Sequence, residues 1–170
     1  IYNSGNTTTS TALLVRGCDA NGTNGSLLQT FQSGNGTTYG SISFTSTGIS
    51  YNTTSDMRLK KNITDSKTGI NVLNKIQIKD YQYINRGEEV VQGFLAQQLY
   101  EVYPQAVTKG TDEKDENGRL VNPWMVDYSK LTPLLIKSVQ DQQAQIEELK
   151  AENAKLSQQM DAVLKAMQKN

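Results

Sequence analysis

The sequence predicts an α+β domain that follows a β-rich, fibre-like segment and leads into a long C-terminal coiled-coil helix. Three observations predict this order. Residues 1–54 are almost uncharged and rich in Asn-Gly pairs, residues 55–128 mix helical and strand-like spacings, and residues 129–170 lack glycine and repeat apolar residues every seven positions. Each of the three segments is taken as a separate domain.

The first segment is expected to form short strands joined by tight turns. It contains two charges, Arg16 and Asp19, and eight of the 13 glycines. A disordered Gly/Ser/Thr linker is the alternative. Because each apolar run is too short for a core within one chain, identical chains are expected to intertwine into an all-β fibre. The runs lie at 12–16, 26–31, 39–46 and 48–52, and the turn-forming Asn-Gly pairs at 21–22, 24–25 and 35–36.

The central segment alternates helical and strand-like patterns. Ile70, Leu73 and Ile76 have the spacing of a short amphipathic helix, and Pro104 is expected to end a second one. We therefore predict helices over 68–76 and 95–104, a strand over 77–84 paired with one over 90–94, and a polar loop over 111–122.

The polar loop imitates the start of a calcium-binding EF-hand loop but does not complete it. Its acidic and amide residues begin at Glu113. The twelfth position of an EF-hand loop must supply a bidentate carboxylate, and here that position is occupied by Trp124. The chain has no histidine and one cysteine, Cys18, so zinc and copper sites are not expected. We expect a solvated hairpin loop, no metal and no cofactor.

The last segment reads as one helix from Ser129 onward, with apolar residues at seven-residue spacing. A helix of this length would extend far beyond a small domain at about 1.5 Å per residue, so self-association is favoured over packing on its own domain. Two polar positions in the seam would select the register, and the spacing leaves open whether two or three chains associate. The predicted seam comprises Leu135, Val139, Gln142, Ile146, Leu149, Asn153, Leu156, Met160, Val163 and Met167.

Composition excludes several functional classes. The 17 basic and 17 acidic residues balance, which argues against a nucleic-acid partner. No apolar run approaches the length of about 20 residues that spans a bilayer, and no secretory signal is recognised, so no membrane partner is expected. A lone cysteine fits folding in a reducing compartment.

Ser55 and Lys60 are the candidate catalytic residues. Without histidine, a serine nucleophile needs another base, and a lysine serves when burial favours its neutral form. The alternative is a surface loop in which Ser55 or Asp56 caps a short helix and Arg58, Lys60 and Lys61 are solvated.

Three blocks in order resemble the C-terminal intramolecular chaperone, auto-processing domain of phage tail spikes and tail fibres, which is also seen in myelin regulatory factor. They are "SDMRLKKNI" from Ser55, "QGFLAQQLYEVYPQAV" over 92–107 and "VDYSKLTPLLIKSVQDQQAQIEEL" over 126–149. The resemblance implies a homotrimer that folds the fibre shaft of the same polypeptide and then releases itself by serine-lysine autoproteolysis.

Carried onto this chain, the resemblance makes Ser55 the nucleophile, Lys60 the general base and Thr54–Ser55 the scissile bond. Asp56 and Arg58 would orient the loop. The mature part would belong to the virion tail fibre and reach a host surface receptor, while the chaperone part acts in the host cytoplasm during assembly.

Two alternatives remain open. One is a non-cleaving, permanent trimerisation cap of an adhesive fibre. The other, a membrane-tethered transcription factor released by the same chemistry, is poorly supported without a basic surface or an apolar span.

Overall fold

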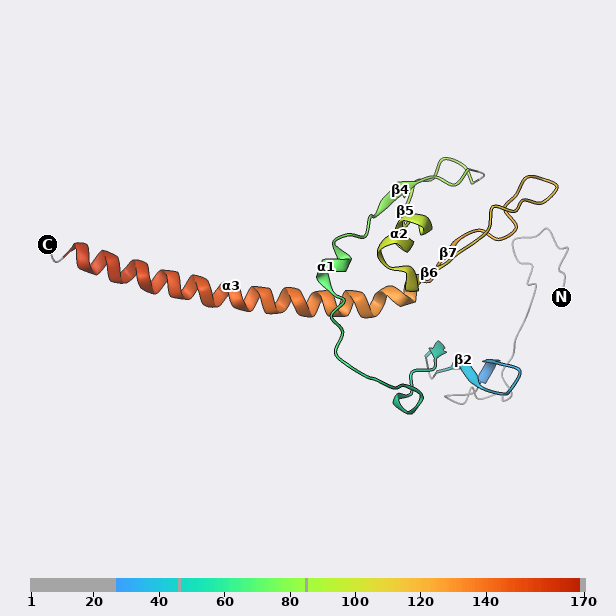
Figure 1. Cartoon of the computed structure of the whole chain (residues 1–170), viewed down its shortest axis with the longest axis horizontal. Coiled ribbons are helices and arrows are strands. Elements are labelled where there is room, and N and C mark those ends of the chain that lie inside the picture. Colours follow the sequence, from blue (N-terminus) through green and yellow to red (C-terminus); the bar gives the residue numbers. More distant parts are fainter. Residues whose placement is uncertain (1–26, 46, 85, 169–170) are drawn as a thin grey trace. The chain divides into compact units, whose positions relative to one another are not determined.

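The computed structural model describes residues 27–45, 47–84 and 86–168. The chain divides into two compact units, residues 1–63 and 64–170. The first contains a three-stranded sheet, and the second combines short helices and two-stranded sheets with a long C-terminal helix, so the α+β prediction is confirmed (Figure 1). The run expected over 12–16 and the first two Asn-Gly pairs lie outside the described residues.

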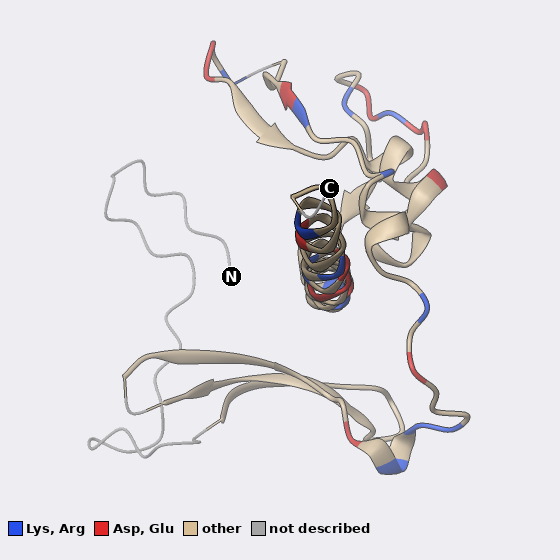
Figure 2. Ribbon diagram, turned by 90° about the vertical axis from the view of Figure 1, so that its left-hand side faces the viewer, with Lys and Arg blue, Asp and Glu red and all other residues tan. Residues whose placement is uncertain are grey.

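The sheet of the first unit is an antiparallel meander. Strand β1 (Leu27–Gln32) pairs with β2 (Thr38–Phe44), which pairs with β3 (Ile49–Thr53), as expected from the three apolar runs. The Asn35–Gly36 pair forms the first turn, where Gly36 adopts a φ of 84° that favours glycine. Figure 2 shows that this sheet carries no charged residue until the turn after β3.

The two faces of this sheet differ in chemistry. On one face Ser50, Asn52 and Ser43 join in side-chain hydrogen bonds, with Asn52 Nδ2 3.1 Å from Ser43 Oγ. Ile42 pairs with Tyr51 across β2 and β3, and Tyr51 is 78% exposed. A single chain therefore leaves apolar sheet surface in water, which is the condition that favours burial between copies.

The second unit is built from short elements. Helix α1 (Ile70–Leu73) is shorter than expected, and the chain beyond it winds on to Ile76 through tighter i→i+3 bonds. The remaining elements are β4 (Lys79–Tyr81) paired with β5 (Val91–Gly93), α2 (Ala96–Val102), the 3₁₀ turn η2 (Pro104–Ala106), and β6 (Val107–Thr108) paired with β7 (Met125–Val126). The predicted strand pairing and the end of α2 before Pro104 are confirmed.

The polar loop between β6 and β7 is a hairpin, as expected. The Asp115 carboxylate accepts hydrogen bonds from the backbone amides of Asn117 and Arg119, at 2.9 and 2.8 Å. Gly118 completes the turn with a φ of 76°. The Asp115 carboxylate therefore stabilises the turn of its own loop.

The C-terminal helix begins within two residues of its predicted start. Asp127 caps the 3₁₀ turn η3 (Tyr128–Lys130) through the Ser129 amide, and α3 (Leu131–Met167) follows for 37 residues, about 55 Å at the usual rise. Figure 1 shows the short elements gathered around its amino-terminal turns, with the later turns extending past them.

The core of this unit is small and lies at the start of α3. Leu131 and Leu134 of the helix pack with Leu99, Tyr103 and Ala106, and these five are its buried hydrophobic residues. Helix residues after Ser138 contribute nothing to this core.

A polar contact ties α1 to the same helix. Asp141 Oδ2 accepts a hydrogen bond of 3.1 Å from the Ile70 amide, and its other oxygen pairs with Lys137. Gly69 is buried beside this contact. A side chain is not accommodated there, because a Cβ would collide with Asp141 Oδ2. The Lys137 ion pair, and then the Ile70 amide, hold the pKa of the Asp141 carboxyl below its ordinary value.

We expect Asp141→Asn to lower the melting temperature at pH 7. Because the pKa of Asp141 is lower in the folded chain, its stabilisation is complete above the unfolded value of about 4 and is lost as the pH falls through the folded value. Thermal unfolding followed by circular dichroism at pH 7 and pH 3 should show the difference from wild type shrinking in acid. Asp161→Asn, on an exposed turn of the same helix, is the control, and a difference independent of pH would contradict the assignment.

Candidate active site

The structure brings Ser55 and Lys60 into direct contact. Lys60 Nζ donates a hydrogen bond to Ser55 Oγ at 2.7 Å. The 3₁₀ turn η1 (Met57–Leu59) lies between them, closed by bonds from the Leu59 amide to Asp56 O and from the Lys60 amide to Met57 O. This single turn reverses the chain, so residues five apart meet.

Asp56 and Arg58 build that turn. Asp56 Oδ1 accepts from the Arg58 amide at 2.8 Å, which caps the turn, while the guanidinium of Arg58 binds the same carboxylate, with Nη2 2.6 Å from Oδ2. The Arg58 side chain, followed by its amide, lowers the pKa of the Asp56 carboxyl, and the carboxylate raises the pKa of Arg58. The predicted loop-orienting residues therefore bind each other, and the Lys60 amine hydrogen-bonds to Ser55.

Thr54 lies at the point where the sheet ends. Its amide donates to Tyr39 O at 3.0 Å and its hydroxyl to Thr38 O at 2.9 Å. The peptide bond between Thr54 and Ser55 thus joins a residue held by β2 to a residue that contacts the amine of Lys60. This is the bond that the sequence motif assigns to cleavage.

Both members of the pair are exposed to water in a single chain. The 2.7 Å separation of Lys60 Nζ and Ser55 Oγ is the distance of a direct hydrogen bond, within the reach required for proton transfer. The structure therefore brings together the two side chains that the sequence singled out as candidates.

The predicted seam residues all lie on α3, in the unit that begins at residue 64. All ten are exposed on α3, and Leu135 is 49% exposed directly beside Leu134, which is 2% exposed. The two leucines mark two adjacent stripes of the helix, one facing its own domain and one left exposed by the residues that the structure describes.

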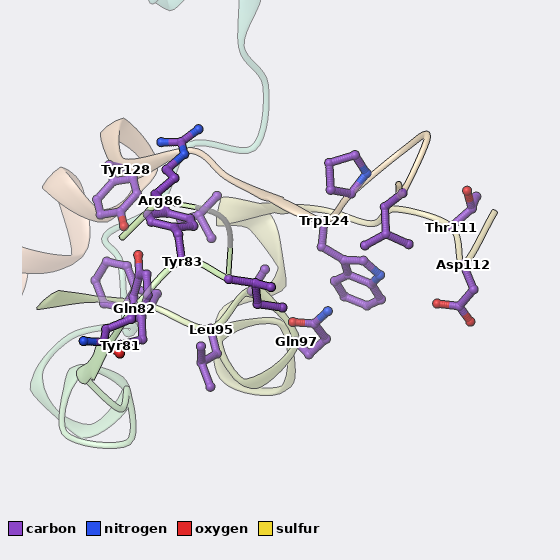
Figure 3. Close-up of a pocket in the computed structure, with 16 residues that line it drawn as sticks. Tyr81, Gln82, Tyr83, Arg86, Leu95, Gln97, Thr111, Asp112, Trp124 and Tyr128 are labelled. Carbon is purple, nitrogen blue, oxygen red and sulfur yellow. The ribbon is translucent and has the colours of Figure 1, made fainter. Parts of the chain in front are cut away.

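An open groove of about 690 Å³ in the second unit was not predicted from the sequence. Figure 3 shows Tyr81, Tyr83 and Tyr128 on one side of it and Trp124 on the other. The Arg86 guanidinium lies 4.7 Å from the Tyr83 ring centroid. Tyr81 and Tyr83 share the two-residue spacing of a strand, but Trp124 and Tyr128 come from a distant segment, so sequence spacing does not indicate that the four meet. The groove shares no residue with the Ser55 turn.

Within the described ranges, no cluster of three or more acidic, cysteine or histidine side chains is arranged to hold a metal ion. None of the helices in that part of the chain combines the length and apolarity needed to cross a bilayer.

The described chain thus has a serine hydroxyl in contact with a lysine amine in its first unit, and an α+β fold with a long terminal helix in its second. Residues 55–108 match the model of a peptidase family described as chaperone of endosialidase. This match over residues 55–108 supports the family resemblance predicted from the motifs. No curated protein matches the chain.

Proposed function

We propose that this protein is an intramolecular chaperone that trimerises and folds a viral tail fibre or spike and then cuts itself off between Thr54 and Ser55. The observation that carries the proposal is the 2.7 Å contact between Lys60 Nζ and Ser55 Oγ. The family match, which begins at the same serine, supports it.

Cleavage begins with an acyl shift within the chain. Neutral Lys60 accepts the hydroxyl proton of Ser55, and Oγ attacks the carbonyl carbon of Thr54 through a five-membered ring. The C–N bond breaks, and Lys60 returns the proton to the departing nitrogen. The product is an ester between the Thr54 carbonyl and Ser55 Oγ, with a free amine on Ser55.

Water then completes the reaction. It attacks the ester carbon, releases a carboxylate at Thr54 and restores the hydroxyl of Ser55, and the proton that is set free is taken up by the amine of Ser55, the new amino terminus. Overall, one water molecule hydrolyses the Thr54–Ser55 peptide bond, and no other co-reactant is needed. The Asp56–Arg58 pair maintains the turn that keeps the base within reach during both steps.

Assembly is proposed to control this reaction. Lys60 is exposed in a single chain, and an ammonium ion in water is no base. Neighbouring copies that cover the site would exclude water and favour the neutral amine. Cleavage would then wait until the chains have assembled, and removal of the chaperone would leave the fibre kinetically trapped.

The exposed seam of α3 supports self-association. Its apolar members, such as Val139, Leu149 and Val163, are 57–62% exposed, and Gln142 and Asn153 interrupt them as register-setting polar positions do. In this proposal the partners are two further copies and the fibre shaft of the same polypeptide. The mature fibre serves in the virion and reaches a host receptor, while the chaperone part acts in the host cytoplasm.

The exposure of Ser55 and Lys60 also favours a second candidate, a permanent trimerisation cap that is never cleaved. In that case the Lys60–Ser55 hydrogen bond closes a surface turn and has no chemical role. The two candidates share the seam and differ only in the fate of the Thr54–Ser55 bond.

We expect Ser55→Ala and Lys60→Ala each to reduce cleavage below about one-thousandth of the wild-type rate, because nucleophile and base act as a unit. Intact-mass measurements at neutral pH should show wild-type fragments with Ser55 as the new amino terminus. Lys61→Ala, which changes the neighbouring exposed lysine, should cleave normally. One uncut mass in all four proteins would favour the permanent cap.

Changing Val139, Ile146 and Leu149 together to serine should dissociate the chains, since each substitution removes apolar seam surface. Analytical ultracentrifugation should report a trimer for wild type and a monomer for the variant, and the variant should stay uncut. Serine at Gln140, Glu148 and Lys155, outside the seam on the same helix, should leave both properties unchanged. Normal cleavage by a monomeric variant would disprove assembly control.

A further inference from the structure

The ladder between β2 and β3 continues for one residue beyond β3, to the residue whose carbonyl is attacked. Gly40 pairs with Thr53, and the Thr54 amide then donates to Tyr39 O at 3.0 Å. The Thr54 hydroxyl adds a second bond, to Thr38 O at 2.9 Å. An exposed residue at the end of a strand is thereby held at two points by the same neighbouring strand.

Gly40 allows this close approach. A Cβ at Gly40 would collide with the carbonyl oxygen of Asn52 and would lie 3.7 Å from the Cα of Thr53. The colliding oxygen belongs to the backbone of β3, so no side-chain rotation relieves the collision. Any larger residue at this position must push the end of β3, and with it Thr54, away from β2.

The two sides of the Thr54–Ser55 bond are thus restrained by different elements. Strand β2 holds the acyl side through Thr54, and the η1 turn brings the base to the nucleophile side. Ring closure by Ser55 Oγ requires the Thr54 carbonyl to hold one orientation, and each free rotation that is removed beforehand lowers the entropic barrier.

We propose that strand β2 acts as a clamp on the acyl side of the scissile bond, with Gly40 and the Thr54 hydroxyl as positioning residues for self-cleavage. This inference rests on the proposed function. The clamp exists only when β2 and β3 are paired, so efficient cleavage requires that the last sheet before the chaperone domain has folded. Cleavage then depends on folding within each chain as well as on assembly.

The test compares cleavage rates by intact mass in the full-length assembled protein. Thr54→Val keeps the side-chain shape but removes the hydroxyl, and we expect cleavage about threefold to tenfold slower, as for one lost hydrogen bond. Thr54→Ser keeps the hydroxyl and should restore the rate. Gly40→Ala should slow cleavage on the order of 10²-fold, because it displaces the reacting carbonyl. Gly48→Ala is the control, since a Cβ there meets no atom within 4 Å.

Wild-type rates in both Thr54→Val and Gly40→Ala, with wild type itself cleaving, would overturn the clamp and leave the proposed function intact. If Gly40→Ala fails to fold, the contrast between Thr54→Val and Thr54→Ser decides. Absence of cleavage in wild type would defeat the proposed function and the clamp's catalytic role with it. Hydrogen exchange in uncut Ser55→Ala checks the contact independently: a protected Thr54 amide supports the clamp, and free exchange overturns it.

Discussion

The folded unit from residue 64 onward depends on the packing of the start of α3 against three buried residues, Leu99, Tyr103 and Ala106. Leu131 and Leu134 supply the apolar surface from the helix, and the short elements α1, α2 and β4–β7 have too few buried residues to form a core without them. The caps at Asp127 and the Asp141 contact then fix where the helix starts and how the chain enters α1. The chaperone domain is thus organised around one end of a helix.

The same helix carries more apolar surface than its domain can use. A 37-residue helix that buries residues only at its start leaves a long, largely apolar stripe exposed, and exposed apolar surface of this kind is typical of an interaction site. The sheet of the first unit likewise exposes apolar side chains on one face. In the proposed function, assembly of the chains buries both exposed apolar surfaces. The same assembly enables cleavage at Ser55, so burial and chemistry are linked.

Much of the fold was predictable because its signals are local. Strands β1–β3 follow from short apolar runs and the Asn35–Gly36 turn, and α2 ends where proline prevents its continuation. The predicted helix over 68–76 was too long, since its residues are β-branched or polar at many positions and Gly69 provides no side-chain cap. The aromatic groove was missed because tertiary packing, with no sequence spacing, brings its residues together.

The sequence by itself determined the family motif, the candidate pair Ser55 and Lys60, and the seven-residue repeat of α3. Only the tertiary structure decided that one turn closes the pair to 2.7 Å, and that β2 holds Thr54. It also decided that Leu134 faces its own core while Leu135 is left exposed. A sequence pattern identifies the apolar residues of a helix. Which of them are buried is decided by how the surrounding elements pack against that helix.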